Sequence, residues 1–121
     1  MEESAEAVAA YEAALPTDDR VERKRMFGVP CAFVNRQMFF GTFGPSVIAR
    51  VGPKRVATLV AQPGMKVFVP TEGKPWEDYV QVETFDDAAL LTTLAAEAMT
   101  WTLRVPTGKK LKDGKKPASG G

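Results

Sequence analysis

The side chains that most often carry out catalysis are scarce in this sequence. It has no histidine and a single cysteine, Cys31. Without histidine, the chain lacks the commonest general base, the usual partner of Ser and Cys nucleophiles and the commonest metal ligand. A reactive thiol at Cys31 would need a nearby cation such as Lys24, Arg25 or Arg36 to lower its pKa. Free cysteine is more often a small buried hydrophobe, and we favour that interpretation.

Four carboxylates gather between residues 72 and 83: Glu72, Glu77, Asp78 and Glu83. A general acid–base pair would need two of them facing each other in a pocket, and a solvated loop and strand edge is the simpler interpretation. Gly108-Lys109 resembles the end of a phosphate-binding loop, but Leu103 and Lys110 stand where that motif requires Gly and Ser or Thr. We therefore predict no catalytic, cofactor-binding or metal site, and a protein that is not an enzyme.

Length and composition predict one ordinary globular domain. A chain of 121 residues is long enough for a single self-sufficient core. No apolar run approaches a membrane span, and the acidic start does not resemble a secretory signal. One cysteine cannot form an internal disulfide, which fits a reducing compartment. These features favour a cytoplasmic protein without a membrane contact.

The elements expected from the sequence surround an aromatic stretch, residues 25–44, which holds five of the seven phenylalanines. It reads as two short strands joined at Asn35-Arg36, where Asn tolerates the positive φ of a tight turn. In the second strand, Met38 and Phe40 should point away from Phe39. The other expected elements are helices over residues 3–15, from Pro53 and from about residue 84 to 104, and strands over 46–51, 65–70 and 76–82. Thr84 or Asp86 is the expected cap of the last helix. Together they predict an α+β domain with an antiparallel sheet of about five strands.

Three surfaces are candidates for binding. Phe43, Lys74 and Trp76 combine aromatic side chains and a cation near loops, a composition typical of protein contacts. The phenylalanines Phe27, Phe39, Phe40 and Phe43 could stack nucleic-acid bases, but only one cation lies among them, which favours a core. The lysines of the C-terminal tail could bind polyanions nonspecifically or could simply aid solubility: Lys109, Lys110, Lys112, Lys115 and Lys116.

The order of several short motifs resembles the TfoX N-terminal domain family, also called Sxy. Arg25-Met26-Phe27-Gly28 precedes an aromatic strand, a turn, Met38-Phe39 and a second aromatic strand. Met65-Lys66-Val67-Phe68 and Gly73-Lys74-Pro75 before Tyr79-Val80-Gln81-Val82 are similar to the second half of that family. The likeness covers roughly residues 5–106. One departure is that Gly28 is followed by Val29-Pro30, where many relatives carry a Gly pair.

The resemblance implies a domain over residues 1–106, with residues 107–121 expected to form a disordered Lys-rich tail. It also implies a role in transcription regulation, since full-length relatives regulate competence for DNA uptake together with the cyclic-AMP receptor protein. The family supplies no catalytic residues. The expected function is thus a non-enzymatic regulatory or protein-interaction module with a protein partner such as a transcription regulator. The alternatives are a nucleic-acid-associated protein acting through its tail and a small-molecule-binding domain, and an open sheet edge could pair two copies into a homodimer.

Overall fold

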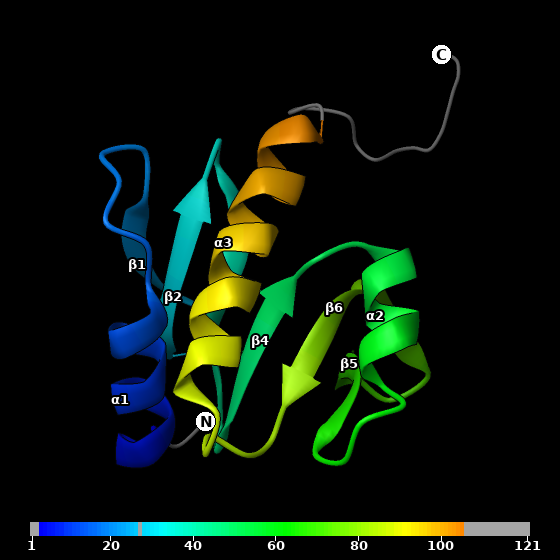
Figure 1. The fold of residues 1–121 in the computed structure, drawn as a ribbon. Helices are drawn as coiled ribbons and strands as arrows, with labels where there is room; N and C mark the ends of the chain where they lie inside the picture. The colour runs from blue at the N-terminus through cyan, green and yellow to red at the C-terminus, as the bar shows by residue number, and fades with distance from the viewer. Residues whose placement is uncertain (1–2, 27, 106–121) are drawn as a thin grey trace, which may run out of the picture.

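Three helices pack against one face of a six-stranded antiparallel sheet in the computed structural model, which describes residues 3–26 and 28–105 (Figure 1). The strand order is β1-β2-β3-β4-β6-β5. In chain order the elements are α1 (Ala5–Ala14), β1 (Glu22–Met26), β2 (Val29–Val34), β3 (Gln37–Phe43), β4 (Ser46–Arg50), α2 (Pro53–Leu59), β5 (Met65–Thr71), β6 (Lys74–Val82) and α3 (Ala88–Arg104). The α+β class is therefore as predicted, with six strands where about five were expected.

The aromatic stretch forms the β2–β3 hairpin, as predicted. Asn35 and Arg36 both have positive φ, 52° and 64°, which is the geometry of a two-residue turn whose twist matches the strands. Phe39 is an extra residue on β3, because Ala32 pairs with Phe40 while Phe33 pairs with Met38. The simple alternation expected for this strand was therefore wrong, and Phe39 and Phe40 both lie in the same buried cluster.

The main core lies between the sheet and the helices. Tyr11 of α1 stacks on Phe40 with ring centroids 5.7 Å apart, and α3 contributes its own apolar side, including Leu94 and Ala98. Figure 1 shows α3 crossing the middle of the sheet, between α1 and α2. Because α1 and α3 also contact each other, the two ends of the described chain are joined in one core.

Two local details differ from the sequence expectations. The expected elements include no strand before the hairpin, but residues 22–26 form the edge strand β1. Its four exposed side chains, residues 22–25, are all charged. Arg23 pairs with Glu12 of α1, and Arg25 pairs with Glu3 just before α1. The cap of α3 is neither Thr84 nor Asp86 but Asp87, whose carboxylate accepts a hydrogen bond from the N–H of Leu90. Pro53 does begin α2, as its fixed φ predicts.

Candidate functional site

A second apolar cluster lies on the face of the sheet that the helices do not cover. Ala49 and Val80 pair across β4 and β6 and belong to the main core, so their neighbours Ile48 and Tyr79 point to the opposite face. We call this group the far-face cluster: buried Cys31, Met38, Ile48, Phe68 and Tyr79, rimmed by partly buried Met26, Phe33, Phe43 and Trp76. None of its members comes from a described helix. The sheet therefore carries apolar side chains on both faces, with helices on one.

Aromatic contacts bring two of the three candidate surface residues together. The ring of Phe68 makes edge contacts with both Phe43 and Trp76, at centroid distances of 4.8 and 5.3 Å. The ring centroid of Trp76 also lies 5.2 Å from that of Tyr79. Trp76 thus folds partly onto its own domain while remaining incompletely buried. Lys74 stands exposed two residues earlier on β6, opposite Thr71, so strand alternation places it on the same side of the β5–β6 hairpin as Trp76.

An irregular register explains how Trp76 and Tyr79 come to share a face although they are three residues apart. Val67 of β5 pairs with Val80, but the next residue, Phe68, pairs with Trp76. The extra residues of β6 form a bulge, which bends the strand and re-aims its side chains. The sequence could not reveal this bulge, since simple alternation along β6 places Trp76 with Val80 and Val82, on the helix side.

Tyr79 is tied to the sheet through both its ring and its hydroxyl. The hydroxyl donates a hydrogen bond of 2.7 Å to the carbonyl oxygen of Met38. Burial raises the pKa of Tyr79, so the hydroxyl stays protonated and keeps donating. The guanidinium of Arg50 lies 5.6 Å from the ring centroid and pairs with Asp78 at 2.6 Å. A hydrogen bond and an ion pair therefore fix the position of Tyr79 and its neighbours at one border of the far-face cluster.

The far face is close to electrically neutral. Three of its cations have carboxylate partners: Lys24 with Glu22 at 3.5 Å, Lys66 with Glu83 at 3.2 Å, and Arg50 with Asp78. The exposed Lys74 has no carboxylate partner among the described residues. Lys24 also lies 5.3 Å from the ring centroid of Phe33. A surface that binds a polyanion presents several unpaired cations, whereas here three of the four are paired with carboxylates. The far face therefore suits an apolar or mixed partner better than a phosphate backbone.

Cys31 occupies the interior of this cluster and is fully buried. Its Sγ lies 3.9 Å from the carbonyl oxygen of Thr42, and burial raises the pKa of the thiol. A raised pKa lowers the thiolate fraction at neutral pH, and the thiolate is the nucleophile. The interpretation of Cys31 as a buried hydrophobe is confirmed, and the side chain does not reach a surface where a substrate could meet it.

The other sequence candidates separate clearly. Phe39 and Phe40 are fully buried, so they belong to a core and not to a base-stacking platform. Phe27 and the five tail lysines lie outside the described residues. Of the four clustered carboxylates, Asp78 and Glu83 hold the ion pairs above, while the other two are exposed. Met26 and Phe33 were not predicted as surface residues. Met26 lies two residues from Lys24 and Phe33 two residues from Cys31, so strand alternation could have placed each pair on one face.

Neither metal-ligand groups, nor membrane helices, nor similarity to known proteins assigns a function to this chain. Within residues 3–26 and 28–105, no three His, Cys, Asp or Glu side chains gather as a metal site would require. In the same ranges, no helix has the length and apolar character needed to cross a membrane. No family model, curated protein or solved structure matches the chain.

Proposed function

We propose that this chain is a non-enzymatic regulatory or protein-interaction module that docks a protein partner on its far face, in the cytoplasm. The observation that carries the proposal is the far-face cluster itself. Its rim aromatics Phe33, Phe43 and Trp76 are only partly buried, and no described helix covers them. Partly exposed aromatics around a packed apolar centre are typical of the residues that anchor protein partners.

The resemblance to the TfoX N-terminal domain family supports the same proposal. It indicates a transcription regulator as the class of partner. The bulge that groups Phe43, Phe68 and Trp76 falls in the segment where the likeness rests on Met65-Lys66-Val67-Phe68 and Gly73-Lys74-Pro75. The motifs that suggest the family therefore also build the proposed docking surface.

Three of the four far-face cations are paired with carboxylates, which argues against nucleic acid as the partner of this face. A second candidate function, polyanion binding through the lysine-rich tail, would use residues outside the described ranges and needs no contribution from this face. Pairing of two copies through a sheet edge is opposed by the edge strands. β1 is short and charged, and β5 carries Pro70, which cannot donate to a ladder.

The test compares two apolar positions on neighbouring strands, the partly buried Trp76 and the exposed Val69. The full chain, a Trp76→Ser variant and a Val69→Ser variant are immobilised and exposed to lysate of the source cells. Val69 is 44% exposed and lies outside the far-face cluster, so its substitution controls for a general loss of surface hydrophobicity. We expect one protein to be captured by the full chain and by Val69→Ser but not by Trp76→Ser.

A purified candidate is then titrated into ¹⁵N-labelled chain. Binding should shift the indole N–H signal of Trp76 and leave that of Trp101, on the helix side, in place. Equal capture by all three baits, or a shift confined to Trp101, would contradict the proposal. Binding to labelled duplex DNA that disappears in a chain ending at Gly108 would favour the tail instead.

A further inference from the structure

A groove on the helix side of the sheet, opposite the far-face cluster, has the properties of a small-ligand site. It runs along α3 beside the loop that leads into α2 and has a volume of about 550 Å³, within the usual range for ligand pockets. Its walls combine apolar, hydroxyl and charged side chains, among them Val51, Ala96, Glu97, Thr100, Trp101 and Arg104.

Trp101 forms the apolar end of this groove. Its indole ring lies against Gly52, where a Cβ atom would come within 3.0 Å of the ring carbons. Gly52 also has a φ of 93°, so glycine serves both the backbone turn and the close approach of the ring. The indole Nε1 is buried and has no hydrogen-bond partner among the described residues, so packing alone holds the ring in place.

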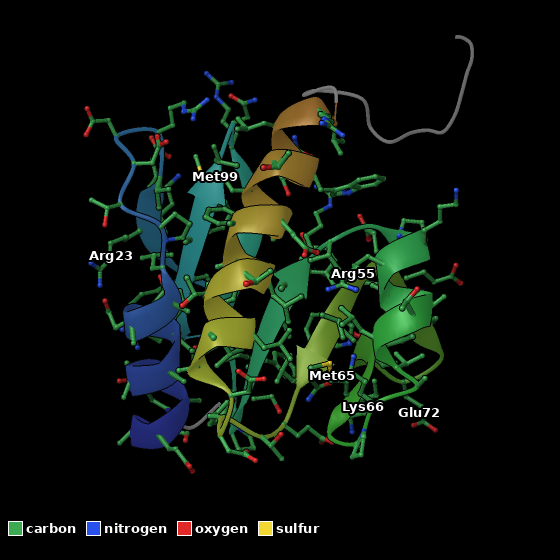
Figure 2. The ribbon with its side chains drawn as sticks, in the orientation of Figure 1. Arg23, Arg55, Met65, Lys66, Glu72 and Met99 are labelled. Atoms are coloured by element: carbon green, nitrogen blue, oxygen red, sulfur yellow. The ribbon has the colours of Figure 1, made fainter. Side chains whose placement is uncertain are left out.

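The charged side chains of the groove leave one cation without an ion pair among the described residues. The carboxylate of Glu97 accepts a hydrogen bond of 2.9 Å from Arg55 of α2 and is thereby neutralised. Figure 2 shows Arg55 between α2 and α3. Arg104, one turn beyond Thr100 on α3, is exposed and makes no ion pair with any described residue. The groove therefore has one spare positive charge beside an aromatic wall.

We propose that this groove binds a small carboxylate with a flat apolar body. The body packs against Trp101 and Val51, and the carboxylate pairs with the guanidinium of Arg104, which is suited to bidentate contact with two oxygens. The hydroxyl side chain of Thr100, next to Trp101 on α3, adds a polar group to the same wall. The geometry assigns α3 a binding role separate from its packing role, since its other side forms the main core.

The test uses 2-naphthoate as the probe and 2-naphthylmethanol as its uncharged counterpart. The chain contains two tryptophans, so a ¹⁵N spectrum of the full chain has two indole N–H signals, one for each face. We expect 2-naphthoate to shift the Trp101 signal in a saturable way and to leave the Trp76 signal unchanged. The uncharged counterpart should bind the same groove more weakly.

Two variants separate charge from shape. Arg104→Gln should weaken 2-naphthoate by about three- to tenfold and leave 2-naphthylmethanol unaffected, the size expected for an exposed charge-assisted contact. Lys66→Gln, which removes the same charge on the far face, should change neither affinity. Ala96→Leu fills the groove from an exposed helix position and should weaken both probes.

Three results would overturn the proposal. They are no shift of Trp101 at millimolar probe, equal shifts of both indoles, or the same affinity in Arg104→Gln as in Lys66→Gln. Thermal melts of each variant confirm that the fold is intact before affinities are compared. Because the reporter is Trp101 and the proposed docking face is reported by Trp76, failure of one proposal leaves the other standing.

Discussion

Replacing Phe68 tests whether the far-face cluster is a true second core. Phe68 is fully buried, and its ring makes edge contacts with Phe43 and Trp76. Phe68→Ala removes a buried aromatic side chain and should lower the free energy of unfolding by about 3–5 kcal/mol. Phe68→Leu keeps most of the buried apolar area but loses two aromatic contacts worth roughly 0.5–1.5 kcal/mol each, so it should cost about 1–3 kcal/mol.

Urea unfolding followed by tryptophan fluorescence measures both effects. With an m value of about 1.5 kcal/mol per M, the alanine variant should unfold at a urea concentration about 2–3 M lower than the parent. Native emission should also move to longer wavelength, because Trp76 becomes more hydrated when the ring beside it is lost. Val69→Ala, at the neighbouring exposed position, should change the free energy by less than about 0.5 kcal/mol.

A cost below about 1 kcal/mol for Phe68→Ala, with unchanged emission, would refute the reasoning. It would mean that the aromatic rings of the far face are a loosely held surface layer. The proposed docking face would then lack the packed centre that positions its rim.

Three further predictions concern ionisation, a helix cap and a close contact. Burial raises the pKa of Tyr11 to about 12 and that of Tyr79 as well, so neither hydroxyl should ionise in the folded chain near pH 10, as followed by absorbance at 295 nm. Both folded-state pKa values exceed the unfolded value of about 10, so the contribution of the two protonated hydroxyls to the free energy of unfolding is intact below pH 10 and declines above it. A free energy of unfolding that rises with pH above about 10 would contradict the assignment. Asp87→Ala removes the cap of α3 and should cost about 1 kcal/mol in a thermal melt, whereas Asp87→Ser should restore most of the loss. Gly41→Ala places a Cβ atom 2.7 Å from the Sγ of Cys31 and should cost about 1–3 kcal/mol, part of which Cys31→Ala recovers in a double-mutant cycle; strict additivity would exclude the contact as the cause.

The sequence predicted the elements that depend on local signals. The Asn35-Arg36 turn, the start of α2 at Pro53 and the long amphipathic α3 follow from backbone preference and periodicity, and the structure has all three. It did not predict β1, because an edge strand outside the main core can be almost wholly charged and then has no apolar alternation. Local sequence also does not determine that β6, and not β5, pairs with β4.

The two candidate sites differ in the same way. Phe43 and Trp76 were identifiable as residues, but their grouping around Phe68 depends on a bulge in β6 that only strand pairing creates. The groove beside Trp101 was not foreseen, because the ring lies over Gly52, a neighbour that helical periodicity alone cannot identify.

The strand order has a consequence for how the chain folds. Four of the five strand pairings join consecutive strands, namely the β1–β4 meander and the β5–β6 hairpin. The pairing of β4 with β6 is the exception, and it must close a loop that contains α2 and β5. Local pairings form before distant ones because loop closure costs entropy, so we expect this β4–β6 seam to form after the two units that it joins. The far-face cluster spans that seam, with Ile48 on one side and Phe68 and Tyr79 on the other. The proposed docking surface is therefore complete only when β4 and β6 are paired, and a chain in which they are unpaired cannot present it.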